Sequence, residues 1–239
     1  MSVNSHDRKR IRVAAAPINW GVWRLDPASP TSDQMLDTIA DAGYEGCELG
    51  PVGYLASEPD DVARRFAPRG LEIVAAYVAT DLAAPLSPAF LEEGHVVATI
   101  LAAGDGKVLL LGDAMSDARA TVTGRVEQFS ETWWSNEDWQ QVRQNIKAIS
   151  DLAAVHGVRL AVHPHAGTHI ESGREIDLLF NQDGEQAPLL CLDTGHILIG
   201  GVDPVSVLRR YADRVALVHA KDVDGTILDR LRAGQMTYR

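Results

Sequence analysis

Apolar and polar positions along this chain form two kinds of stretch, short apolar runs and longer amphipathic segments. The longest amphipathic segment begins at Ser135 and ends at Gly157, and its apolar residues recur three or four positions apart, which is the period of a helix. These apolar residues are Trp139, Val142, Ile146, Ile149 and Ala153. The run Leu189–Leu192 is apolar throughout, which is typical of a strand buried on both faces.

This pattern repeats along the chain, so that each predicted strand is followed by a predicted helix. The predicted strands cover 11–16, 44–49, 71–78, 107–111, 159–162, 189–192 and 215–218. The predicted helices cover 31–42, 57–68, 88–103, 135–157, 171–180, 204–211 and 226–231. Thr31 and Gln34 have the spacing of a capping box, and Ser57 is the expected cap of the second helix.

Strands that alternate with helices predict an α/β fold with a parallel sheet and outer helices. Two closures are compatible with this pattern, an open doubly wound sheet and a (β/α)8 TIM-type barrel. No Gly-x-Gly-x-x-Gly motif follows the first strand, and polar residues end several strands, so we favour the barrel. We expect residues 1–10 to be a disordered tail and 11–239 to be one barrel domain that lacks strand 8 in this chain.

The candidate chemistry lies where three predicted strands end. The first of these ends carries His163 and His165, and the second carries Asp193 and His196. The third strand ends in His219, followed by Lys221 and Asp222. In a parallel barrel these ends face one mouth, so one shared site, with a metal ion, explains all of them. The alternatives are that Asp193 only caps a turn, that His219 is a core histidine, and that Lys221 pairs with Asp222 at the rim.

Three further residues are predicted to line the mouth or face it, and a long connection lies near it. Glu48 ends the second strand, where it would face the site or pair with an arginine, and Asn19 and Trp20 follow the first strand and would line the pocket. The connection 114–134 is long enough to be a lid or binding loop, and its Trp133-Trp134 pair fits local packing better than sugar stacking.

Composition narrows the classes of function. The chain has 239 residues, 46% of them hydrophobic, and a net charge of −11. An acidic protein without a basic groove is poorly suited to bind nucleic acid or an anionic membrane. Without an apolar leader or a membrane-spanning run, the chain is expected to be cytoplasmic. We expect Cys47 and Cys191 to be free core thiols, with a disulfide or a zinc pair as the alternatives.

Together these segments resemble the xylose isomerase-like sugar isomerase/epimerase superfamily and, within it, the inosose dehydratases of inositol catabolism. The resemblance rests on the order of five motifs: Pro17-Ile18-Asn19-Trp20, Ala42 to Gly50, His163 to Thr168, Asp193-Thr194-Gly195-His196 and His219-Ala220-Lys221-Asp222. It implies a TIM barrel that binds one divalent ion, with manganese or cobalt favoured and magnesium or zinc as alternatives.

The resemblance also assigns roles to residues of this chain. Asp193 and His219 match metal ligands of the family, and His196 matches a substrate-binding histidine. His163 stands where many members have a glutamate, and we predict it as the third ligand because imidazole also binds such ions, with a position behind the ligands as the alternative. The family's strand-8 glutamate would lie beyond Arg239, which leaves the activity of this shortened chain open.

The implied chemistry is enolisation of a small polyhydroxy ketone or sugar, by an inosose dehydratase-like lyase or a sugar isomerase/epimerase. We predict catalytic roles for Glu48, His165, His196 and Lys221, of which His165 and His196 also contact substrate. A hydroxypyruvate- or ketose-type isomerase and an inactive sugar-binding barrel are the alternatives. No nucleic-acid or membrane partner is expected, and a homodimer is left open.

Overall fold

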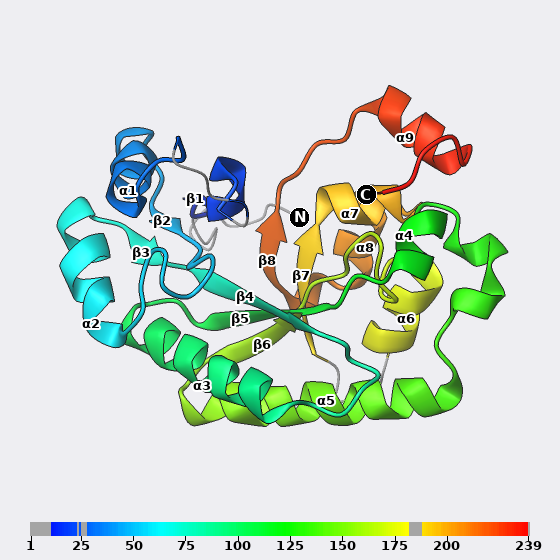
Figure 1. Ribbon diagram of the computed structural model, residues 1–239, viewed down its shortest axis with the longest axis horizontal. Coiled ribbons are helices and arrows are strands. Elements are labelled where there is room, and N and C mark those ends of the chain that lie inside the picture. Colours follow the sequence, from blue (N-terminus) through cyan, green and yellow to red (C-terminus); the bar gives the residue numbers. More distant parts are fainter. Residues whose placement is uncertain (1–10, 23, 25–27, 182–187, 239) are drawn as a thin grey trace, which may run out of the picture.

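The computed structural model describes residues 11–22, 24, 28–181 and 188–238 (Figure 1). The predicted tail 1–10 lies outside these residues. Parallel strands form two sheets, with strand orders β1-β2-β3 and β4-β5-β6-β7-β8. The strands are β1 (Ala14–Ala15), β2 (Gly46–Cys47), β3 (Glu72–Ile73), β4 (Ala75–Thr80), β5 (Val108–Asp113), β6 (Arg159–Val162), β7 (Leu189–Asp193) and β8 (Val215–His219).

The two sheets meet at the predicted strand 71–78, which the structure divides into β3 and β4 at Val74. The N–H of Leu49 donates to the carbonyl of Ala75, so the hydrogen bonding passes from one sheet to the other. The sheets therefore curve round as one α/β barrel. Among the described residues, the pairing does not continue from β8 back to β1, so the barrel is open on that side.

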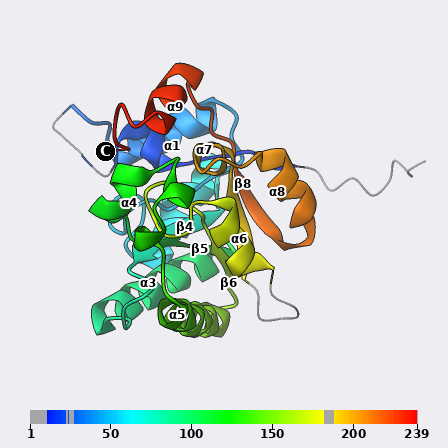
Figure 2. The same cartoon turned by 90° about the vertical axis from the view of Figure 1, so that its right-hand side faces the viewer.

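Helices cover the outside of this barrel (Figures 1 and 2). They are α1 (Ser32–Asp41), α2 (Pro59–Asp61), α3 (Pro88–Ala103), α4 (Asp117–Val122), α5 (Asn136–Val155), α6 (Gly173–Phe180), α7 (Thr194–Ile199), α8 (Pro204–Arg210) and α9 (Gly225–Arg232). Short 3-10 turns cover Pro17–Trp20, Ala67–Arg69, Val126–Gln128, Ser130–Thr132 and Ala212–Arg214. The long α5 lies beside α3 against β4–β6.

Local sequence explains most helix ends. The capping box of Thr31 and Gln34 is confirmed, and a second one joins Ser135 to Asp138. The predicted helix 57–68 is wrong in its detail, because α2 begins at Pro59 and continues as a π-helical turn, Val62–Phe66. Ser57 is not its cap: the carboxylate of Asp61 instead accepts hydrogen bonds from the backbone N–H groups of Ser57 and Glu58.

Two further helix details differ from the prediction. The predicted helix 31–42 ends one residue earlier: α1 ends at Asp41, Ala42 is exposed, and Gly43 turns the chain at a φ of +82°. The helix predicted from residue 171 begins at Gly173, where the hydroxyl of Ser172 accepts the N–H of Glu175.

Alternate residues of each strand face two apolar layers, as the period of two requires. Leu109 and Leu111 of β5 pack outward in the large core under the helices. Val108 and Leu110 face inward, in a small inner cluster with Ala75, Ala161 and Cys191. Cys47 and Cys191 are buried free thiols, as predicted. None of the described helices is both long and apolar enough to cross a membrane.

Candidate functional site

The predicted site residues continue the inner cluster toward the barrel mouth. Ala161 and Cys191 belong to that cluster, and two residues further along the chain are His163, directly after β6, and Asp193, at the end of β7. Leu217 packs against the same cluster, and the next inward position after it is His219. The alternation of strand residues therefore aims these three polar side chains at one point, above an apolar floor.

One oxygen of Asp193 is the centre of the arrangement. Its Oδ2 lies 3.4 Å from Nε2 of His163, 3.5 Å from Nδ1 of His219 and 3.8 Å from Nε2 of His196. The Nζ of Lys221 is nearer still, at 2.8 Å. Asp193 and His163 are buried, whereas Lys221 reaches in from the exposed rim.

The other oxygen of Asp193 has a structural task. Its Oδ1 accepts the backbone N–H groups of Gly195 and His196, both at 3.0 Å, and so caps α7. Capping and facing the mouth are thus not alternatives for this residue. The cap fixes the carboxylate so that the second oxygen points at the imidazoles.

His219 is held from the far side of the barrel by Glu48. Its Nε2 lies 2.5 Å from Oε1 of Glu48, which follows β2, while its Nδ1 lies 3.2 Å from Nε2 of His163. A carboxylate on one ring nitrogen fixes the orientation of the other, an arrangement common around metal-bound histidines. The structure thus pairs Glu48 with a histidine and not with an arginine.

The charges of this cluster are strongly coupled. Burial alone would raise the pKa of Asp193, but hydrogen bonds from His163, His219 and Lys221 outweigh it and hold that pKa well below its usual range. Burial would lower the pKa of His219, yet its contacts with Asp193, Cys191 and Glu48 raise it to about 12. The cluster therefore stabilises a positive charge next to Asp193.

His165 and His196 form a second layer above Asp193. Their rings lie 3.7 Å apart between centroids, and the hydroxyl of Tyr238 lies 3.4 Å from Nδ1 of His196. Burial, assisted by the neighbouring histidine, lowers the pKa of His165 to about 4 and that of His196 to about 2. Both rings are therefore neutral near pH 7.

The contacts at the rim show whether Lys221 faces the cluster or pairs with Asp222, the two alternatives left open by the sequence. Lys221 reaches inward to Asp193 and, at 3.0 Å, to Nε2 of His196, while the carboxylate of Asp222 accepts the N–H of Val223. The Thr194 hydroxyl accepts the backbone N–H of Lys221 and donates to its carbonyl. Lys221 therefore belongs to the cluster and not to a rim pair with Asp222.

The remaining predicted residues lie outside this cluster of contacts. Asn19 is exposed, and Trp20 is half-buried against the outer core, both in the 3-10 turn after β1. Trp134 stacks on His169, with centroids 4.8 Å apart, and the Trp133 ring carries the Arg174 guanidinium. These contacts are local packing of the connection after β5.

Sequence reasoning did not include several polar residues near the mouth. Asp113 ends β5 and binds the backbone N–H and Nδ1 of His169, but strand alternation places it on the outer side. Tyr238 was also missed, because no sequence pattern connects it with His196. The position of Asp113 at a strand end was the one available signal.

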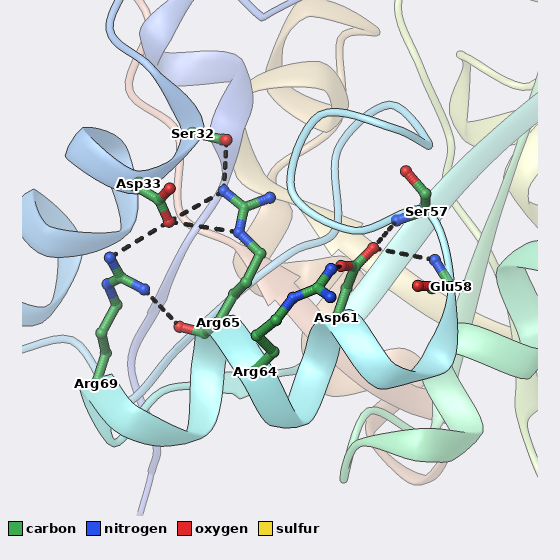
Figure 3. A pocket seen from close by; sticks show the side chains of 8 residues that line it. All are labelled: Ser32, Asp33, Ser57, Glu58, Asp61, Arg64, Arg65 and Arg69. Carbon is green, nitrogen blue, oxygen red and sulfur yellow. Dashed lines mark hydrogen bonds and ion pairs between the residues drawn. The ribbon is translucent and has the colours of Figure 1, made fainter.

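A cavity of about 620 Å³ lies elsewhere, beside α1, α2 and the π-helical turn that follows α2 (Figure 3). Its arginines are already paired with acids or hydroxyls that line the same pocket. The lining residues are Ser32, Asp33, Ser57, Glu58, Asp61, Arg64, Arg65 and Arg69. Because these charges are matched, the pocket offers little net attraction to a charged ligand.

The donor atoms of the mouth suit a divalent cation. Within the described residues, ligand atoms of His163, Asp193 and His196 lie within 4.8 Å of one another, as do those of His163, Cys191 and His219. The Nδ1 of His163 is buried without a hydrogen-bond partner, so its Nε2 is the nitrogen directed at the cluster. Imidazole nitrogens with a carboxylate oxygen are ligands of zinc, cobalt and manganese.

Comparison with known proteins agrees with this architecture. Inosose dehydratase of Geobacillus kaustophilus is 28% identical over 240 residues, covering 95% of this chain and 74% of that protein. Inosose dehydratase of Salmonella typhimurium is also 28% identical over 240 residues, covering 97% and 76%.

Two solved structures share the fold. The E. coli 3-keto-D-glucoside 4-epimerase has a TM-score of 0.67 at 15% identity, with 95% of this chain and 89% of that chain covered. The IOLI protein with a bound zinc atom has a TM-score of 0.65 at 13% identity, covering 87% and 72%. The family model described as xylose isomerase-like TIM barrel matches residues 36–236. This match spans most of the chain, which therefore belongs to the xylose isomerase-like TIM barrel family.

Proposed function

We propose that this chain catalyses the metal-dependent enolisation of a polyhydroxy ketone and the loss of water from it, as an inosose dehydratase-like lyase. The observation that carries the proposal is the convergence of His163, His219 and His196 on Oδ2 of Asp193. The relatives named inosose dehydratase support the substrate class, a cyclic ketone rich in hydroxyl groups.

Asp193, His219 and His163 would hold one divalent ion, with manganese or cobalt as our first choice and zinc or magnesium as alternatives. The zinc atom of the IOLI structure supports a divalent ion in this fold. When bound, such an ion stabilises the negative charge that forms on the carbonyl oxygen during enolisation. The contact between Glu48 and His219 keeps the His219 ring oriented toward it.

The other residues of the mouth would act on substrate protons and charge. His165 and His196 are neutral imidazoles, so each is able to accept a hydrogen bond or a proton from the substrate. The Lys221 ammonium would neutralise an oxyanion. In the overall reaction a proton leaves the carbon beside the carbonyl, a C=C bond forms, and the β-hydroxyl leaves as water.

A second candidate, a sugar-binding barrel without catalysis, is favoured by one contact. The Lys221 ammonium already lies 2.8 Å from Asp193, where it neutralises the carboxylate without an ion. A ketose- or hydroxypyruvate-type isomerase differs from the lyase only after enolisation.

One experiment separates these functions. The purified chain is loaded with Mn²⁺, analysed for metal content, and incubated with an inosose in D2O while proton NMR follows the carbon beside the ketone. The lyase removes the proton from that carbon and releases an enone in which the carbon carries no hydrogen, while an isomerase replaces the proton with deuterium without losing water. If the chain binds no metal and does not remove this proton, the proposal is overturned and the sugar-binding barrel remains.

We also propose a cytoplasmic protein with a small-molecule substrate and no nucleic-acid or membrane partner, because the net charge is −11. Light scattering would decide between a monomer and the homodimer left open by the sequence.

A further inference from the structure

A tyrosine on β4 faces the same interior as the cluster. Ala76 and Val78 pack in the outer core, whereas Ala75 belongs to the inner cluster and Tyr77 packs against it. Tyr77 pairs in register with Leu110, which is also an inward residue. Its ring therefore fills the wall of the barrel below the mouth.

A glycine makes room for the Tyr77 hydroxyl. A Cβ added to Gly112 would lie 2.0 Å from the phenol oxygen and 2.7 Å from Cζ of Tyr77. Gly112 is not among the glycines with positive φ, so the backbone conformation does not require glycine here. Glycine is required here because the Tyr77 hydroxyl occupies the space that a side chain would need. Gly112 lies near the carboxyl end of β5, at the mouth.

The ring of Tyr77 is fixed beside a predicted metal ligand. Its edge meets the ring of His163, with centroids 5.7 Å apart and an angle of 81° between the planes. This contact, with the inner cluster below, determines where the hydroxyl points. The hydroxyl lies beside Gly112, near the carboxyl end of β5.

The Tyr77 hydroxyl differs from those of two other tyrosines in its hydrogen bonding. Tyr54 and Tyr211 donate hydrogen bonds to Pro30 and Asp177, but no hydrogen bond of the Tyr77 hydroxyl exists within the part of the chain that the structure describes. Burial, with the nearby charge of Asp113, raises the pKa of this phenol, so it keeps its proton. The Tyr77 side chain is only partly buried, and its hydroxyl is not among the described buried polar atoms that lack a partner, so the hydroxyl is open to solvent or to a ligand oxygen at the mouth.

We propose that the Tyr77 hydroxyl donates a hydrogen bond to one oxygen of the substrate, at the opposite end of the β4–β8 sheet from Lys221, and thereby selects which hydroxyl pattern the site accepts. The inference rests on the proposed function, because the polyhydroxy ketone comes from there. A site that offers a fixed donor rejects analogues that lack the matching oxygen, since the donor is then left unpaired.

The test uses the Mn²⁺-loaded full chain with an inosose and with the analogues that each lack one of its hydroxyl groups. Tyr77→Phe removes only the hydroxyl. It should lower kcat/KM for the inosose roughly 10- to 100-fold and abolish the discrimination against one particular deoxy analogue. Gly112→Ala should displace the ring and cause the same loss. Metal content and Tm of Tyr77→Phe should match the wild type, as should every property of the exposed control Tyr44→Phe.

A binding arm keeps this inference distinct from the proposed function. The Kd of inositol, a polyol without a ketone, is measured by calorimetry for the wild type and Tyr77→Phe. If the wild type turns over no inosose but binds inositol at least about 10-fold more tightly than Tyr77→Phe, the function fails and the Tyr77 contact stands. Equal affinities, or unchanged discrimination in Tyr77→Phe, overturn the contact. A wild type that neither binds inositol nor turns over the inosose overturns both.

Discussion

The two sheets of the barrel differ in length and in what they position. β1, β2 and β3 have two residues each, while β4 to β8 have four to six. The four side-chain nitrogens described near Oδ2 of Asp193 come from β8 or from the segments that follow β6, β7 and β8, and the short sheet contributes Glu48. Longer ladders fix strand ends more firmly, so precise chemistry is placed on them.

The largest expected effect is on the free energy of unfolding. It compares a buried ion pair between helices that follow β5 and β6 of the long sheet with an exposed ion pair on α1, beside the short sheet. Arg119 of α4 binds Glu175 of α6 through two hydrogen bonds of 2.8 and 2.9 Å, and both side chains are buried. Glu175→Gln leaves a buried guanidinium without its counter-charge and should lower the free energy of unfolding by about 3–5 kcal/mol. Asp37→Asn, which removes an exposed partner of Arg69, should cost about 1 kcal/mol or less. Urea unfolding measures both, and similar losses would contradict the comparison.

The next effect concerns the centre of the long sheet. Asp193→Asn keeps the cap of α7, since asparagine is an equally good N-cap, but removes the charge that faces the imidazoles. Mn²⁺ affinity should fall on the order of 100-fold or more, with the fold retained. Asp203→Asn is the control, because Asp203 also caps a helix, α8, but at an exposed position away from the mouth. Unchanged metal affinity by calorimetry would remove Asp193 from the ligand set.

A smaller effect tests the contact by which Glu48, from the short sheet, reaches the site. Glu48→Gln replaces the carboxylate that holds Nε2 of His219 with a neutral amide. Metal affinity should fall roughly 10- to 100-fold, the usual cost of losing such a partner, while Asp193 still binds. Glu92→Gln on the exposed face of α3 should change nothing. If Glu48→Gln binds metal as the wild type does, the short sheet has no part in the site.

Local sequence patterns predicted the helix and strand bounds that depend on residues close together in the sequence. The bounds of α3 (Pro88–Ala103) and β6 (Arg159–Val162) match the prediction to the residue, and the apolar stripe of α5 is buried as expected. The break at Val74 was missed, because the apolar run continues through it and only the curvature of the barrel interrupts the pairing.

For the candidate site too, the sequence predicted some contacts and missed others. Strand ends gave His163, Asp193 and His219 as neighbours, because parallel strands fix that geometry. The contact between Glu48 and His219 joins residues 171 positions apart. The missing side chain of Gly112 is important only because the Tyr77 hydroxyl lies against it in the fold. Neither contact leaves a periodic trace in the sequence.

The smallest expected effect is a dependence of stability on pH at Glu171. This buried carboxylate accepts the N–H groups of Gly124 and Gly167 and so ties the loop that carries His165 to the connection after β5. Burial raises the pKa of Glu171 although both hydrogen bonds oppose the rise. The folded protein therefore holds a proton that the unfolded chain has already released, over the pH range between the two pKa values.

Within that range the free energy of unfolding falls as pH rises, by at most about 1.4 kcal/mol per pH unit, and above the folded pKa the contribution stays lost. Glu171→Gln mimics the protonated form and should lack this loss. The difference in unfolding free energy, variant minus wild type, should therefore increase with pH from about 4.5 upward, as measured by urea titrations at several pH values. The exposed control Glu93→Gln should leave the difference flat. A difference for Glu171→Gln that decreases with pH would mean that the two N–H groups outweigh burial at this position.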